Sequence, residues 1–214
     1  MTTTIGLDAD QVLSTTRAVR KRLDFDRPVP AELIRECVDL ALQAPTGSNV
    51  MSMQFVIVTD AAKRAEIGRI YREIFAKYKA SPAYPANRVN PDPTRQAQNL
   101  RVAESADYLA QRMGDAPVLV LACNVGPDRQ SAARGMSNVL PGAWSFMLAA
   151  RARGLGTVWT SMHLAREQEV ADLLGIPYDT VAQAVLTPLA YTLGTDFKPA
   201  QRPPAETFMH WDTW

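Results

Sequence analysis

The stretch TTRAVRKRLDFDRPVPAELIRECVDLALQAPTGSN, Thr15–Asn49, contains the order of elements that decides the fold. Its beginning continues a helix that Asp8 or Asp10 can cap and that we expect to reach about Lys21. Two prolines then break the chain, and helical spacing of apolar residues resumes over Glu32–Ala44. The cluster APTGSN follows as a turn. The stretch therefore predicts a helix, a break, a second helix and a loop.

The remainder of the chain alternates apolar runs with helical patterns. Four runs rich in β-branched and apolar residues predict strands, namely QFVIV (54–58), APVLVLAC (116–123), TVWTSM (157–162) and TVAQAVLTPLAY (180–191). Helices are expected over 61–79, over 94–113, over 142–153 with Gly154 as the stop, and over 167–174. We find no internal repeat, and 214 residues suit one domain over 1–214.

Composition excludes several classes of function. The chain has 23 basic and 22 acidic residues, so no general field attracts it to nucleic acid or to an anionic membrane. Cys37 and Cys123 are too few for a disulfide framework or a zinc cluster, and we expect two buried thiols in a reducing compartment. Neither a leader pattern nor an apolar run of membrane length is found, which predicts a cytoplasmic protein.

Positive charge is concentrated in one place. Arg17, Arg20, Lys21 and Arg22 fall within six residues of a chain whose net charge is only +1. A guanidinium carries forked donors that match phosphate oxygens, so the group can bind a phosphate. The alternative is a basic helix end that offsets the helix macrodipole. Nucleic-acid binding is less favoured, because no second basic stripe or interleaved aromatic residues accompany the cluster.

Other motifs are weaker. The loop residues Thr46–Asn49 offer small polar donors for a ring edge or an anion, although such a cluster is also an ordinary turn. RGLGT lacks the glycine spacing of a dinucleotide fingerprint. His163 and His210 have no cysteine or carboxylate at ligand spacing, which argues against a metal site. No nucleophile motif is present, so hydrolysis is disfavoured.

Taken in order, the opening stretch, GLGTVWTSM, LLGIP and the tail KPAQRPPAE with HWD resemble the FMN-dependent nitroreductase family over nearly the whole chain. The shared pattern is an arginine-rich segment, a Pro-Val-Pro break, an Ala-Pro-Ser/Thr-x-x-Asn loop, a Gly-Leu-Gly turn and a late basic residue followed by proline. The resemblance implies an α+β fold, with a central and mainly antiparallel sheet flanked by helices. It also implies a domain-exchanged homodimer with two identical sites.

The resemblance assigns cofactor-binding roles to three groups of residues. The FMN phosphate and ribityl chain fall to Thr16, Arg17, Ala18 and Arg20, with Arg202 returning from the tail to the same phosphate. The loop that reaches the isoalloxazine from the other subunit falls to Pro45, Thr46, Gly47, Ser48 and Asn49. The segment whose backbone amide approaches flavin N5 falls to Trp159, Thr160, Ser161 and Met162.

Two stretches of the chain depart from the family pattern. Ala18 stands where the family commonly has serine, which removes one hydrogen bond to the cofactor. Met51, Ser52 and Met53 stand where it has Gln-Pro-Trp, which makes the neighbouring pocket softer and more apolar.

By the same resemblance the chemistry belongs to flavin N5, with no catalytic side chain. NADPH or NADH would deliver hydride, and an electron-poor small molecule such as a nitroaromatic or a quinone would then take it in a ping-pong cycle. The segments 81–94 and 126–135 are candidate lids. The alternatives are a flavin-dependent reductase or dehydrogenase of a specific metabolite, and a non-catalytic FMN-binding protein.

Overall fold

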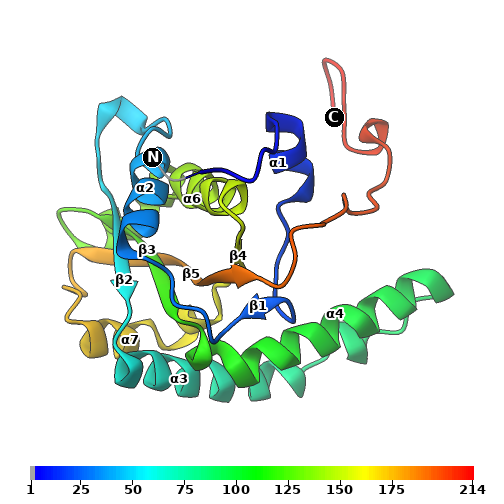
Figure 1. Cartoon of the computed structure of the whole chain (residues 1–214), viewed down its shortest axis with the longest axis horizontal. Helices are drawn as coiled ribbons and strands as arrows, with labels where there is room; N and C mark the ends of the chain where they lie inside the picture. The colour runs from blue at the N-terminus through cyan, green and yellow to red at the C-terminus, as the bar shows by residue number, and fades with distance from the viewer. Residues whose placement is uncertain (1–2) are drawn as a thin grey trace.

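The computed structural model describes residues 3–214. At its centre is a five-stranded sheet in which β1, β5, β3 and β2 follow one another and β4 also pairs with β5 (Figure 1). All paired strands are antiparallel, which confirms the predicted α+β fold. The strands are β1 (Leu23–Asp24), β2 (Met53–Val58), β3 (Val118–Val125), β4 (Leu155–Thr157) and β5 (Val181–Thr192).

The helices flank this sheet. They are α1 (Ala9–Thr15), α2 (Ala31–Ala41), α3 (Ala61–Lys79), α4 (Pro93–Arg112), α5 (Arg129–Arg134), α6 (Leu140–Ala152) and α7 (Glu167–Leu174). The bounds of α3 and α7 coincide with the predicted ranges. Gly154 follows α6 with a φ of 75°, which confirms the left-handed residue expected there.

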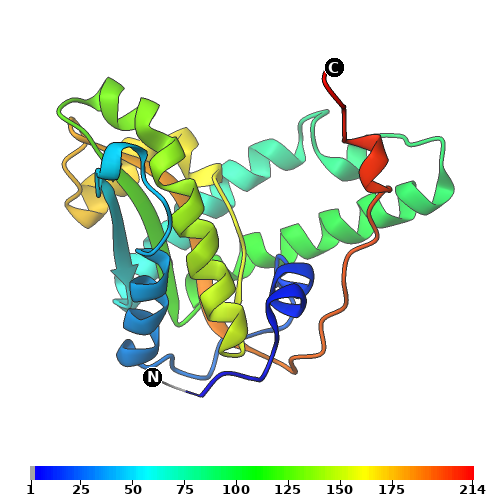
Figure 2. The ribbon, with the colours of Figure 1, turned by 90° about the horizontal axis from the view of Figure 1, so that it is seen from above.

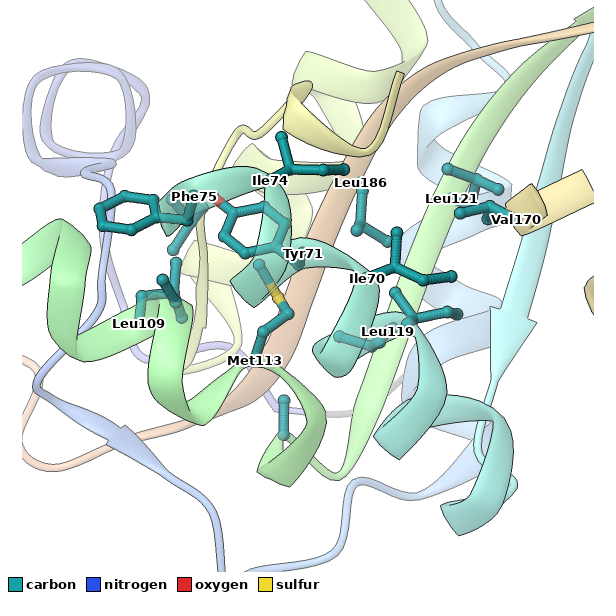
Figure 3. Packing of buried hydrophobic residues seen from close by; sticks show 14 of the residues in the cluster. Ile70, Tyr71, Ile74, Phe75, Leu109, Met113, Leu119, Leu121, Val170 and Leu186 are labelled. Carbon is teal, nitrogen blue, oxygen red and sulfur yellow. The ribbon is translucent and has the colours of Figure 1, made fainter. Parts of the chain in front are cut away.

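The core lies on both faces of β3, whose side chains alternate as in any strand. Leu119 and Leu121 belong to the cluster formed with α3, and Figure 3 shows Leu119 beside Ile70 of α3 and Leu121 beside Val170 of α7. Val118 and Val120 face the other way, into the cluster formed with α2 and α6. Figure 2 shows the same arrangement from above. The sheet thus separates two helical layers and fixes where each loop emerges.

Helix α6 is the apolar helix of the sequence. Phe146, Ala149 and Ala150 are buried in the cluster shared with α2, so one chain covers most of this helix by itself. Trp144 stays 37% exposed on its outer side. The homodimer therefore stays a prediction.

The prediction of a helix up to Lys21 is wrong, because α1 ends at Thr15. The hydroxyls of Thr15 and Thr16 donate to the carbonyl oxygens four residues earlier, at 2.5 and 2.6 Å. Such local bonds compete with continued helix. Beyond them Val19 N–H donates to Thr157 O at 2.9 Å. Residues 16–20 are therefore a non-helical segment tied to the sheet, Lys21 and Arg22 form a turn, and the basic helix end is ruled out.

Three smaller expectations also change. The strand expected over 157–162 ends at Thr157, after which Thr160 makes a single bridge to Leu186. The expected loop 126–135 contains α5, whose first turn is capped by Asp128. The run QFVIV lies at the edge of the sheet, where it is only partly buried. The segment 81–94 is largely irregular, as predicted, although α4 already begins at Pro93.

Within residues 3–214, none of the helices combines the length and the apolar character that crossing a membrane requires.

Candidate functional site

The arginine-rich segment forms one wall of a cavity of about 280 Å³. Every residue from Arg17 to Arg22 lines it, together with Ser105 of α4 and Phe197 of the C-terminal tail. The segment reaches this position because β1 pairs with β5 and Val19 bonds to Thr157. A sheet therefore holds the cations.

The four cations differ in how their charge is balanced. Lys21 pairs with Glu104 at 2.6 Å, and Arg22 pairs with Asp196 at 2.5 Å. Arg17 instead donates to the carbonyl oxygen of Lys198 at 2.7 Å, and Arg20 donates to Ser105 Oγ at 3.3 Å. Within the described chain neither of these two guanidiniums has a carboxylate in ion-pair contact. The cavity thus carries two uncompensated charges that can bind an anion.

Arg20 connects this cavity to a second one, of about 350 Å³, because it lines both. Burial lowers the pKa of its guanidinium, which nevertheless stays charged at neutral pH. The second cavity has an aromatic wall and a floor formed by residues 158–162; the aromatic residues are Tyr71, Phe75, Tyr78, Tyr84 and Trp159. A cationic cavity that can bind an anion and an apolar aromatic cavity are therefore adjacent.

The floor segment, residues 158–162, is anchored to the sheet at Thr160. Thr160 exchanges backbone hydrogen bonds with Leu186 at 2.9 and 3.1 Å, and its hydroxyl donates to Leu186 O at 2.6 Å. On either side of it, the backbone N–H groups of Trp159 and Ser161 find no acceptor among residues 3–214. Met162 completes the floor. Two fixed donors therefore flank a rigid anchor at this cavity.

Sequence reasoning missed Tyr71, Ser105 and Phe197, as well as Phe75 and Tyr78 of the aromatic wall. Burial raises the pKa of Tyr71 to about 12, against a smaller opposing effect of the Arg20 charge, so its phenol is protonated at neutral pH. Ser105 and Phe197 are single residues far along the chain, and no motif marks them.

The loop Pro45–Asn49 lies elsewhere. It is a tight turn in which Ser48 and Asn49 have φ of 53° and 59°, and Gly47 N–H donates to Asn138 Oδ1 at 3.1 Å. Figures 1 and 2 both place this loop and the arginine-rich segment on opposite sides of α6. A single chain does not bring them together, and the contribution of this loop from another subunit stays a prediction.

Of the other residues expected to bind the phosphate, only some lie at the arginine cavity. Ala18 lines the arginine cavity, whereas the hydroxyl of Thr16 is already bonded to Val12 O. Arg202 lines a separate cavity of about 270 Å³ with Arg95 and the start of α4. The single chain therefore does not bring Arg202 to the arginine cavity, and its assignment to the phosphate stays a prediction.

A family model supports the resemblance. The model described as the Nitroreductase family matches residues 13–191. No curated protein matches the sequence.

Solved structures share the fold at low identity. An iodotyrosine deiodinase bound to FMN and 3-iodo-L-tyrosine matches with a TM-score of 0.71 and 21% identity, over 95% of this chain and 98% of that one. Nitroreductase A from Vibrio parahaemolyticus matches with a TM-score of 0.68 and 18% identity, over 96% and 75%. A mutant of an FMN and NADPH-dependent nitroreductase from Sphigopyxis sp. strain HMH matches with a TM-score of 0.67 and 19% identity, over 97% and 100%.

Proposed function

The chain belongs to the nitroreductase family, and we propose that it is an FMN-dependent oxidoreductase that uses NADPH or NADH to reduce an electron-poor small molecule such as a nitroaromatic or a quinone. One observation carries this proposal. Arg17 and Arg20 lack carboxylate partners among the described residues, and Arg20 joins their cavity to the aromatic one.

The residues present fit FMN. Its phosphate would be held by Arg17 and Arg20, since charge-assisted bonds to phosphate are strong. Its ring would lie at the floor segment, where the N–H groups of Trp159 and Ser161 are unused within residues 3–214. When bound, FMN supplies the acceptance and release of hydride at its ring.

The residues of the chain bind and orient the cofactor and exclude water. The two guanidiniums neutralise the phosphate and fix the position of the cofactor. The backbone donors of the floor segment orient a polar ring edge, and the anchor at Thr160 keeps these donors in place. The protonated phenol of Tyr71 lines the same cavity. The surrounding aromatic side chains exclude water from the acceptor.

The proposal includes a homodimer. The loop Pro45–Asn49 lies across α6 from the arginine cavity, so in the proposed assembly each site takes this loop from the second copy. The NADPH dependence named for one similar structure supports a nicotinamide as the donor. The segment 81–94 contributes Tyr84 and Pro85 to the aromatic cavity, which suits a lid that selects the acceptor.

An absorbance spectrum of the purified protein tests the cofactor. We expect bound flavin whose colour is bleached by NADPH or NADH without oxygen and returns when a nitroaromatic or a quinone is added. A colourless protein that does not take up added FMN would contradict the proposal. A yellow protein that neither nicotinamide bleaches would identify a non-catalytic flavin-binding protein instead.

Arg20→Ala tests the phosphate assignment. The loss of one charge-assisted contact, worth about 1.5 to 3 kcal/mol, should weaken FMN binding by about 10- to 150-fold. Lys21→Ala is the matched control, because it removes the same charge from the adjacent residue while Lys21 already pairs with Glu104. Titration of the apo-protein with FMN gives both constants. Equal losses in the two variants would show that the effect is not specific to Arg20.

A second function competes for the same site. The structural similarity to the deiodinase bound to 3-iodo-L-tyrosine favours a reductase of one specific metabolite. The acceptor panel should therefore include this halogenated amino acid. Reoxidation of the reduced protein by it, but not by nitroaromatics or quinones, would replace the broad acceptor class by the specific one.

A further inference from the structure

Arg151 is a buried cation with no counter-charge. It lies on α6 and is 3% exposed. Its guanidinium donates to Thr15 Oγ1 at 3.1 and 3.3 Å and to Thr195 O at 3.0 Å, all neutral acceptors. Among residues 3–214 its Nη1 has no hydrogen-bond partner, and no carboxylate forms an ion pair with it. Such an arrangement is unfavourable unless another group supplies the missing negative charge.

Arg153 provides the contrast. It follows two residues later, is similarly buried, and pairs with Glu36 at 3.2 Å. The chain therefore balances one of these two cations and leaves the other unbalanced. Burial lowers the pKa of Arg151, and the Arg22 charge lowers it further. An arginine nevertheless remains protonated in proteins, so the charge persists.

Arg151 contacts a residue that lines the arginine cavity. Its Cζ lies 4.8 Å from the centre of the Phe197 ring, and Arg22 Cζ lies 4.2 Å from the same centre. Phe197 lines the cavity, so Arg151 lies behind one wall of it. The guanidiniums of Arg151 and Arg22 contact the same ring, so their charges lie closer together than the Debye length of about 10 Å. Because Arg151 is buried, solvent screens its field less than it screens a surface charge.

We propose that Arg151 is a specificity-determining residue that makes this cavity select the phosphate dianion of FMN over an uncharged flavin. The inference rests on the proposed function, in which the phosphate binds at Arg17 and Arg20. The phosphate then supplies the negative charge that Arg151 lacks within the described chain, without touching it. The bonds to Thr15 and Thr195 hold the guanidinium behind the Phe197 wall of the cavity.

The ratio of FMN affinity to riboflavin affinity tests this role, because the two ligands differ only in the phosphate. Both dissociation constants are measured by flavin fluorescence on the apo-protein. Arg151→Gln removes the charge and keeps hydrogen-bond donors, and should lower the ratio about tenfold through loss of FMN affinity alone. Arg151→Lys keeps the charge and should keep the wild-type ratio. Arg153→Gln, the matched control, removes a balanced charge and should also keep it.

Each other outcome is decisive. A wild-type ratio in Arg151→Gln would overturn the inference, and so would equal losses of FMN and riboflavin affinity, which indicate a structural role. If Arg151→Gln does not fold, Arg151→Met replaces it under the same criteria. A wild-type protein that binds neither flavin would refute the proposed function itself, whereas a failed ratio test leaves that function standing.

Discussion

His163 offers a sharp test of how burial affects stability. It lies in the turn after the floor segment, is fully buried, and neither ring nitrogen has a hydrogen-bond partner among the residues described. Burial lowers its pKa to about 4 from 6.5. We therefore change it to leucine, which has a similar volume and cannot be protonated.

The direction of the pH dependence of stability follows from proton uptake at His163. The unfolded chain binds a proton at His163 near pH 6.5 and the folded chain only near pH 4, so the stability is complete above pH 6.5 and is lost as the pH falls toward 4. With about 1.4 kcal/mol for each unit of pKa difference, the wild-type protein should lose about 2 kcal/mol of unfolding free energy between pH 7.5 and pH 5. His163→Leu should lose almost none.

Urea unfolding at the two pH values measures this difference. The only other histidine, His210, is exposed. The carboxyls with shifted pKa values, including Glu66 and Glu73, have them lowered and therefore titrate below this window. Equal losses of stability in the wild-type protein and in His163→Leu would refute the reasoning.

Two further changes have expected outcomes. Gly68→Ala would place a Cβ 2.7 Å from the backbone nitrogen of Gly114. Because overpacking outweighs the gain in helix propensity, urea unfolding should show a net loss of about 1 to 2 kcal/mol in unfolding free energy. A more stable variant would contradict the close packing of α3. Trp144→Glu changes an exposed side chain of α6, on the face that the proposed dimer would bury. Light scattering should then show monomers, and the circular dichroism spectrum should stay unchanged. An unchanged mass would place the dimer interface elsewhere.

The sequence was sufficient where local patterns decide the structure. Helix α3 has an aspartate cap at Asp60 and apolar residues at helical spacing, and β3 has a long apolar run. The end of α1 was missed because the bond from Val19 to Thr157 joins residues far apart in the chain. The short helix α5, at six residues, is below the length at which periodicity is informative.

The sequence predicted the kind of ligand proposed for the site, but not which residues remain free to bind it. The cluster from Arg17 to Arg22 indicated a phosphate. Which cations remain unpaired depends on Glu104 and Asp196, whose positions only the folded chain defines. Arg151 contributes from a helix that sequence reasoning assigned to packing, because no local pattern distinguishes a balanced cation from an unbalanced one.

The bond between Val19 and Thr157 has a consequence for the order of events during synthesis. The cations are made early, yet their support comes from β4 and from β5, which ends at Thr192. A nascent chain of 150 residues has the charges but lacks β4 and β5, the two strands that position them. The cavity can therefore form only after translation has passed Phe197, and the ligand must be acquired after that point.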